Sequence, residues 1–367
     1  MSLPMRSDQE LNHLPVLDGF RGIAILSVLM MHCLGLPLGW AGVDLFFVLS
    51  GFLITRILIS SAGRHGYYRA FYWRRALRIL PIYYMLFGIA LLFVPQMRNS
   101  WWFYFLYAVN LGLFWQSHHV PGFEHIWSLS VEEQFYSLWP AAVNYLGRKG
   151  LVVVCVVGFI ATVCARLLVA RGAHAFAYDA LRQDGLFMGA LIAIAYTSTP
   201  ALRERITRVS PFVCVAAVLT VAALGRRNMS LLHPTPLNAL LGIPAIALVF
   251  VSAAWWVLMN DSSPMASVFK WRWLREIGKV SYGLYLYHVP ILHAWKHSQL
   301  GQHGRMAGRI GDVLVGGVLS FAVAEFSFHL LEKRINCPVL RARFQVDRSS
   351  AELLPADKGN LHPAFVK

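Results

Sequence analysis

The chain has 367 residues, of which 57% are hydrophobic and 14% charged, and its formal net charge is +15 at pH 7. Soluble domains carry about 25% charged residues, so this composition excludes an ordinary water-soluble protein and indicates a membrane protein. The excess of positive charge favours the positive-inside bias of a polytopic protein over binding to nucleic acid.

Apolar segments of about 17 to 22 residues recur along the whole chain, each close to the length that crosses a ~30 Å hydrocarbon core. Alternating strand patterns are absent from the sequence. We therefore predict an all-α fold, a polytopic transmembrane helical bundle. The segments are centred near residues 26, 49, 87, 108, 137, 160, 190, 218, 248, 287 and 320.

The first segment, LDGFRGIAILSVLMMH at residues 17–32, carries ionisable residues inside an apolar run. Arg21 and His32 are separated by about 16 Å and three turns of an α-helix, which leaves both side chains on nearly the same face. Ionisable residues inside a membrane are candidate functional residues. The alternative is that Arg21 extends to the interface and His32 bonds a neighbouring carbonyl. No basic region precedes this run, so we interpret it as a retained helix and not as a signal peptide.

The second segment, GWAGVDLFFVLSGFLIT, places Asp44 about one turn into a helix that follows the first after a short loop. In such an antiparallel hairpin a contact between His32 and Asp44 is geometrically reasonable. A carboxylate that fixes the tautomer of an imidazole is a common way to make a general base. The alternative is that Asp44 is a helix N-terminal charge favoured by the macrodipole.

Three arginines lie at the start of the third segment, FYWRRALRILPIYY at residues 71–84. Arg75 and Arg78 are three positions apart, Arg74 and Arg78 four, and such pairs share a helix face. Guanidinium groups match phosphates in a bidentate geometry, so the cluster can bind the phosphates of a nucleotide-bearing donor. Binding of anionic lipid headgroups is the alternative.

Carboxylates lie inside the segment HIWSLSVEEQFYSLWP at residues 125–140, where Glu132 and Glu133 need partners or water. Glu132 is a candidate catalytic residue, and structural pairing with the arginine cluster is the alternative.

Two segments near the C-terminal end carry further polar residues. VSYGLYLYHVP contains Tyr282, Tyr285 and His288, although interfacial aromatic residues explain the tyrosines equally well. FAVAEFSFHLLEKRI contains Glu325 and Glu332, and Glu332 is next to two basic residues that indicate the cytoplasmic interface.

Lysine and arginine are distributed unevenly between alternate loops. One set of loops holds 22 of them, in residues 1–16, 56–78, 147–150, 198–210, 259–276 and 332–367. The other set holds 8, in residues 36–40, 95–100, 171–183, 226–236 and 296–309. By the positive-inside rule the first set is cytoplasmic, and so are both termini.

This orientation requires an even number of crossings between residues 56–78 and Arg148, where three apolar segments lie. One of the stretches 101–116 and 127–146 is therefore predicted to be re-entrant or tilted, which is tolerated where it lines a cavity. The prediction is about ten spanning helices plus this one segment.

A single membrane domain is predicted over residues 14–335. Residues 1–13 are expected to form a cytoplasmic N-terminal segment, and residues 336–367 a polar cytoplasmic tail that is disordered. The sequence shows no P-loop, dinucleotide fingerprint, serine-hydrolase elbow or zinc-protease motif. Its five cysteines lack the spacing of a disulfide framework or a zinc site, and no metal ligands are predicted.

Taken together, the segments resemble the integral membrane acyltransferase family 3, which includes the O-antigen and exopolysaccharide acetyltransferases. The resemblance is carried by the Arg21 to His32 spacing, by GVDLFFVLSGFLIT, by the Arg-x-x-Arg of the third segment, by IWSLSVEEQFYSLWP and by VSYGLYLYHVP. It implies that His32 and Arg21 are the functional pair of the first helix and that Arg75 and Arg78 are the functional arginine pair. Members often carry an extra extracytoplasmic hydrolase-like domain, which we do not expect here. Glu332 departs from the Glu-x-Pro that ends the last helix of typical members.

The resemblance implies transfer of an acyl group, usually acetyl, from acyl-CoA in the cytoplasm to a sugar hydroxyl of a cell-surface glycan, in a bacterial inner membrane. The expected partners are acyl-CoA as co-substrate, a glycan acceptor and the lipid bilayer; no tightly bound cofactor and no nucleic acid is expected. Arg74, Arg75 and Arg78 would hold the CoA phosphates, and His32 would act as a base or as a transient acyl carrier. A small-molecule O-acyltransferase of the macrolide type and a glycan transporter or flippase remain alternatives.

Overall fold

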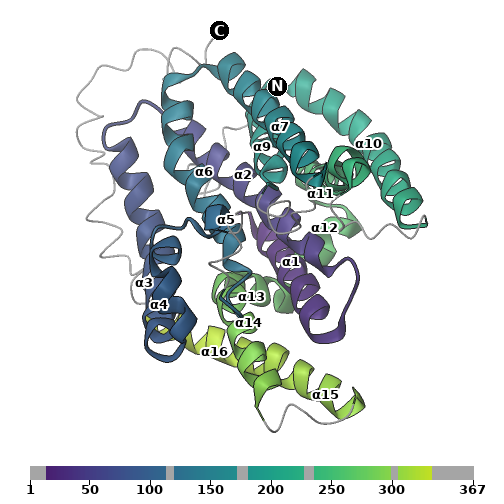
Figure 1. Cartoon of the computed structure of the whole chain (residues 1–367). Helices are drawn as coiled ribbons and strands as arrows, with labels where there is room; N and C mark the ends of the chain where they lie inside the picture. Colours follow the sequence, from purple (N-terminus) through teal and green to yellow (C-terminus); the bar gives the residue numbers. More distant parts are fainter. Residues whose placement is uncertain (1–13, 113–119, 172–180, 227–234, 299–304, 333–367) are drawn as a thin grey trace.

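The computed structural model describes residues 14–112, 120–171, 181–226, 235–298 and 305–332, and within these ranges it is a bundle of helices without strands (Figure 1). The predicted all-α fold is confirmed for this part of the chain. The predictions for residues 1–13 and 336–367 lie outside the described residues. The helices are α1 (Pro15–Leu34), α2 (Gly42–Ser61), α3 (Tyr67–Phe93), α4 (Pro95–Phe105), α5 (Val109–Gly112), α6 (Ile126–Tyr145), α7 (Arg148–Arg171), α9 (Asp184–Tyr196), α10 (Pro200–Arg226), α11 (Ile243–Met259), α12 (Pro264–Phe269), α13 (Arg272–Lys279), α14 (Ser281–His297), α15 (Arg305–Asp312) and α16 (Ser320–Ser327).

Seven helical stretches in the described part of the chain are long and apolar enough to cross a membrane. The chain is therefore a multi-pass membrane protein, but the predicted count of about ten spanning helices is not confirmed. Helix α9 has only 13 residues and is shorter than a bilayer requires. The seven stretches are Pro15–Leu34, Gly39–Ser61, Tyr67–Phe93, Arg148–Ala170, Pro200–Arg226, Asn238–Met259 and Gly308–Leu331.

The two stretches between which the sequence did not decide have different structures. Residues 101–116 contain the end of α4 and the four-residue α5, and neither helix is long enough to span. Residues 127–146 lie almost entirely in the 20-residue α6. Within the described residues the first stretch is thus the one that fails to form a long helix.

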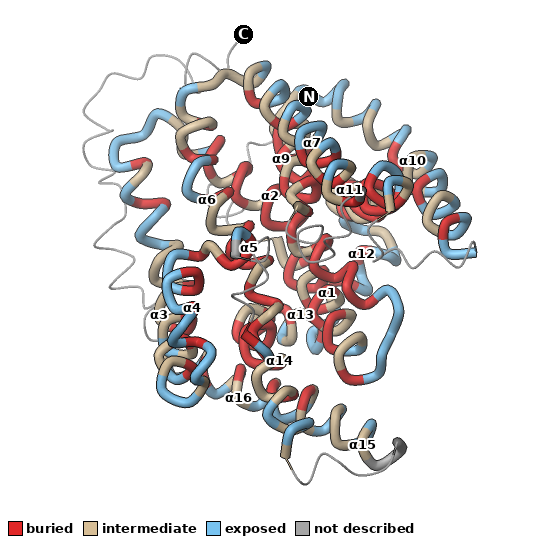
Figure 2. The backbone as a smooth tube through the Cα atoms, in the orientation of Figure 1, coloured by how far each residue is buried: buried red, intermediate tan, exposed pale blue. Residues whose placement is uncertain are grey.

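At the centre of the bundle α2 packs against both α1 and α9, and Figure 2 shows α1 and α2 as largely buried. Helix α2 approaches α9 closely because glycines lie at the contact. A Cβ on Gly51 would lie 2.1 Å from the carbonyl oxygen of Leu186, and one on Gly189 would lie 2.1 Å from that of Val48. Small residues at helix contacts allow such close approach in membrane proteins.

Two buried ion pairs reinforce this centre. Arg166 of α7 donates to both carboxylate oxygens of Asp184 of α9, each at 2.9 Å, and both side chains are fully buried. Arg182, which precedes α9, donates to both carboxylate oxygens of Asp44 of α2. The first pair joins α7 to α9, the second joins the segment before α9 to α2, and both satisfy charges that the bundle interior would otherwise leave unpaired.

The outer face of α10 carries large exposed apolar side chains, among them Phe212, Leu219 and Val215 at 75%, 64% and 59% exposure. Figure 2 shows this helix at the edge of the bundle with exposed residues along most of its length. An apolar outer face of this kind fits contact with lipid chains.

Candidate functional site

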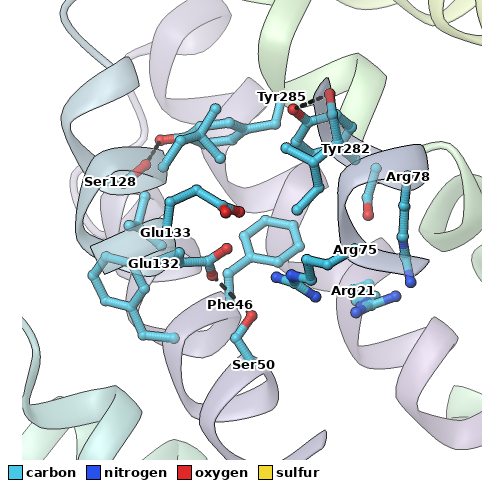
Figure 3. A pocket seen from close by; sticks show the side chains of 15 residues that line it. Arg21, Phe46, Ser50, Arg75, Arg78, Ser128, Glu132, Glu133, Tyr282 and Tyr285 are labelled. Atoms are coloured by element: carbon cyan, nitrogen blue, oxygen red, sulfur yellow. Dashed lines mark hydrogen bonds between the residues drawn. The ribbon is translucent and has the colours of Figure 1, made fainter. Parts of the chain in front are cut away.

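A cavity between α1, α2, α3, α6 and α14 collects charged side chains that the sequence singled out (Figure 3). Its volume is about 70 Å³, which is enough to admit water or a polar group of a ligand. Four predicted site residues line it, namely Arg21, Arg75, Arg78 and Glu132. The structure therefore brings together residues that are up to 111 positions apart in the sequence.

One side of the cavity is formed by the three guanidinium groups of Arg21, Arg75 and Arg78, as Figure 3 shows. Arg75 packs 3.5 Å from the ring centroid of Tyr136, a cation–π contact that orients its guanidinium. Its Nε has no hydrogen-bond partner among the described residues. This wall offers N–H donors and positive charge to an anionic or carbonyl-bearing ligand.

Arg74 is placed differently from its neighbours. It is exposed and does not line the cavity, because a residue adjacent to Arg75 on a helix points about 100° away. The predicted grouping of Arg74 with Arg75 and Arg78 is therefore not reproduced, whereas the pair three positions apart faces the cavity as the helical spacing requires.

The opposite side of the cavity is formed by Glu132 and Glu133 of α6. Ser50 of α2 donates a 2.8 Å hydrogen bond to Oε1 of Glu132 and so fixes this carboxylate. Neither glutamate forms an ion pair within 4.0 Å with an arginine in the described part of the chain. The alternative interpretation, a structural ion pair between these glutamates and the arginine cluster, is therefore not observed among the described residues.

His32 lies at the last turn of α1 and is not among the residues that line the cavity. The helix ends there because Gly35 adopts a left-handed conformation with φ 72° and its N–H bonds the carbonyls of Met30 and Met31. Nδ1 of His32 is 3.0 Å from the carbonyl oxygen of Val28. A carbonyl oxygen can only accept, so Nδ1 carries the proton and Nε2 keeps its lone pair.

The predicted contact between His32 and Asp44 is wrong. Both oxygens of Asp44 are bound by Arg182, and Asp44 is only 1% exposed. The physical reason is that a buried carboxylate is stabilised far more by a bidentate guanidinium than by a neutral imidazole. The backbone carbonyl of Val28 fixes the tautomer of His32 in its place.

The residues that the sequence named only in passing turn out to lie between His32 and the cavity. The hydroxyls of Tyr285 and Ser128 are 2.7 Å apart, and both residues line the cavity. His288 lies with its ring centroid 5.0 Å from that of His32. Interfacial aromatic residues explain Tyr285 equally well from the sequence alone, and no sequence signal identifies Ser50 or Arg182, because each acts through a contact distant in sequence.

The sequence model of the family described as "Acyltransferase domain" matches residues 14–325. A "Putative peptidoglycan O-acetyltransferase YrhL" from Bacillus subtilis is 24% identical over 91% of this chain and 56% of its own length. The "Peptidoglycan O-acetyltransferase OatA" of Listeria monocytogenes is 26% identical over 88% of this chain and 56% of its own length. The "O-acetyltransferase OatA" of Staphylococcus aureus is 27% identical over 76% and 51%, respectively.

The chain thus spans about half the length of these curated relatives. No solved structure is significantly similar to it.

Proposed function

The chain belongs to the acyltransferase family whose model covers residues 14–325, and from this premise we propose that it is a membrane O-acetyltransferase acting on a cell-surface glycan. The relatives named as O-acetyltransferases support the acetyl group and the glycan class. Two of these relatives are named for peptidoglycan, so the acceptors to be tested are peptidoglycan, O-antigen and exopolysaccharide.

The observation that carries the proposal is the cavity of opposed charges. Arg75 and Arg78 reach it from α3 and Arg21 from α1, with Glu132 facing them. Acyl-CoA carries phosphates and a thioester carbonyl, both of which guanidinium N–H groups recognise. In our scheme Arg75 and Arg78 bind the donor phosphates, and Arg21 helps to draw the donor into the bundle, so that its thioester reaches His32 about 16 Å further along the same helix face.

His32 is the general base of this scheme. Its Nε2 lone pair is available because its Nδ1 proton is bound to the Val28 carbonyl. Nε2 removes the proton of the acceptor hydroxyl, the oxygen attacks the thioester carbon, and CoA leaves as thiolate. A base of this kind contributes about 10²- to 10⁴-fold to the rate. The oxyanion formed in the transition state needs hydrogen-bond donors near His32, and an arginine or the hydroxyl of Ser128 is the proposed source.

We also propose that the donor enters from the cytoplasm and that the protein lies in a bacterial inner membrane with both termini cytoplasmic. The support is the charge bias of the loops, 22 lysines and arginines against 8. Arg21 then lies toward the cytoplasm and His32 toward the outer face, so that donor and acceptor reach the chemistry from opposite sides.

The test is acetyl transfer by the purified protein in lipid vesicles. Acetyl-CoA labelled in the acetyl group is supplied with peptidoglycan fragments, lipid-linked glycans or a macrolide, and base-labile label on each acceptor is measured. We expect transfer to one glycan class by the wild type and a loss of at least about 100-fold in His32→Gln. Arg74→Ala, whose side chain is exposed and outside the cavity, is the matched control and should keep wild-type activity.

Label on the macrolide alone would replace the glycan acceptor by a small molecule. Glycan crossing the vesicle membrane unmodified, with no acetyl transfer, would contradict the enzyme and favour a transporter.

A further inference from the structure

Three histidines form a row beside the cavity, and the scheme above uses only the first. The ring of His32 lies 5.0 Å from that of His288, and the ring of His288 lies 5.3 Å from that of His125. They come from α1, from α14 and from the residue before α6. The His125 ring lies 5.4 Å from that of Tyr285, which lines the cavity. The row therefore joins the candidate base to the cavity wall.

The protons on the two inner histidines are fixed by backbone carbonyls. Nδ1 of His288 is 3.1 Å from the carbonyl oxygen of Leu284 and 2.7 Å from that of Tyr285. Nε2 of His125 is 3.3 Å from the carbonyl oxygen of Leu286. Since carbonyl oxygens only accept, these nitrogens donate, and Nε2 of His288 and Nδ1 of His125 keep their lone pairs.

Both lone-pair nitrogens are buried and have no hydrogen-bond partner in the described part of the chain. The exposed fraction of His288 is 0% and that of His125 is 7%. Native proteins rarely leave a buried acceptor unsatisfied, and the exceptions concentrate at functional sites. What is missing beside these nitrogens is an N–H or O–H donor.

Protonation of His32 would create such a donor. When Nε2 of His32 takes a proton, it becomes an N–H, and His288 is the neighbouring ring with a free lone pair. Asp44, the carboxylate predicted to orient this imidazole, is bound by Arg182. The charged groups whose fields reach His32 are Glu124 and Lys296, which are opposite in sign.

We propose that His288 is a positioning residue for acyl transfer, because its Nε2 accepts a hydrogen bond from the N–H of protonated His32. His125 is the next ring in the row, and its Nδ1 is a second buried acceptor. The inference rests on the proposed function, because it requires His32 to be the base. Two charged imidazoles about 5 Å apart repel each other, so the row takes up only one proton beyond the one that each neutral ring already carries.

The proton of the acceptor hydroxyl passes to His32 and then to the leaving thiolate. The acceptor O–H bond breaks as the N–H bond of His32 forms, and the acceptor oxygen bonds to the thioester carbon. The C–S bond then breaks and sulfur leaves with the electron pair. While the cation exists, its Nε2–H is shared between the acceptor oxygen and Nε2 of His288; at the end the thiolate takes this proton, and His32 returns to its neutral form.

The experiment compares two replacements of His288 in the full-length protein reconstituted in lipid vesicles. His288→Gln keeps an amide oxygen near the position of Nε2 that can accept a hydrogen bond, whereas His288→Met is apolar and of similar length. His297→Gln, an exposed histidine on the same helix, is the control. Acetyl transfer from labelled acetyl-CoA gives kcat and KM, and thermal unfolding in detergent gives stability.

We expect kcat to fall about 10- to 100-fold in His288→Met and clearly less in His288→Gln, a share of the ~10²- to 10⁴-fold effect of a general base. KM for acetyl-CoA should stay within about twofold, because His288 does not line the donor cavity. The unfolding temperature of His288→Met should equal or exceed that of the wild type, because an unsatisfied buried acceptor has been removed.

Equal kcat values for His288→Met, His297→Gln and the wild type would overturn the inference while leaving the acetyltransferase intact. Equal losses in the Gln and Met variants, each with a lowered unfolding temperature, would also overturn it, because they indicate a structural role. A wild-type protein without acetyl transfer to any acceptor would overturn the proposed function, and this inference with it.

Discussion

Two groups of charges lie inside this helix bundle, and they are satisfied to different degrees. In the buried pairs Arg166–Asp184 and Arg182–Asp44, each guanidinium binds both oxygens of its carboxylate. In the cavity, Arg75 and Glu132 line opposite sides without an ion pair among the described residues, and Nε of Arg75 has no hydrogen-bond partner there. Charge that is fully paired holds helices together, whereas charge that is left under-bonded in a cavity is available to a ligand.

The largest effect is expected from breaking a pair of the first group. Asp184→Ala leaves the fully buried Arg166 without its carboxylate, which should destabilise the protein by about 3–5 kcal/mol. Little folded protein should then be recovered from membranes, as measured by detergent extraction and size-exclusion chromatography. Normal recovery of a folded Asp184→Ala protein that has lost acetyl transfer would instead indicate that this ion pair has a role in function.

A smaller effect is expected in the cavity. Glu132→Gln keeps an oxygen that accepts the Ser50 hydrogen bond but removes the negative charge opposite the arginines. We expect kcat/KM to fall about tenfold, equivalent to ~1.4 kcal/mol, because the negative charge whose field acts on Arg75 across the cavity is lost. The unfolding temperature should stay unchanged, and a fall in stability without a fall in kcat/KM would contradict the assignment.

The smallest effect is expected when a whole pair is replaced. Asp44→Leu combined with Arg182→Leu removes both buried charges at once, and such replacements are often neutral within about 1 kcal/mol or stabilising. Acetyl transfer should remain within about threefold of the wild type. A loss of 100-fold in a stable double variant would restore Asp44 to the catalytic role that the sequence suggested.

The sequence predicted the helical class and the membrane location because long apolar segments are a local property. It also predicted the shared face of Arg75 and Arg78, since helical spacing determines it. It failed for Asp44, because the competing partner Arg182 lies 138 positions away and no spacing rule connects the two. The residues Ser50, Ser128 and His125 acquire their meaning only from contacts across helices, which one sequence without its fold does not contain.

The number of spanning helices is also difficult to predict from the sequence alone. Composition gave eleven apolar segments, but apolarity alone does not distinguish a helix that crosses a bilayer from one buried inside protein. Helix α9 is apolar and 13 residues long, and it packs against α2 through Gly189. Helix α9 therefore contributes to the packed centre of the bundle through its close contact with α2.

The most direct test of the central claim is the binding of CoA to the wild type, Arg75→Ala and Arg74→Ala. The two variants remove one guanidinium each from adjacent positions, one in the cavity and one exposed. We predict that Kd rises about 10- to 100-fold in Arg75→Ala, since a hydrogen bond to a charged group contributes about 1.5–3 kcal/mol, and is unchanged in Arg74→Ala. Equal Kd values for all three proteins, with equal unfolding temperatures, would contradict the assignment of the cavity as the donor site.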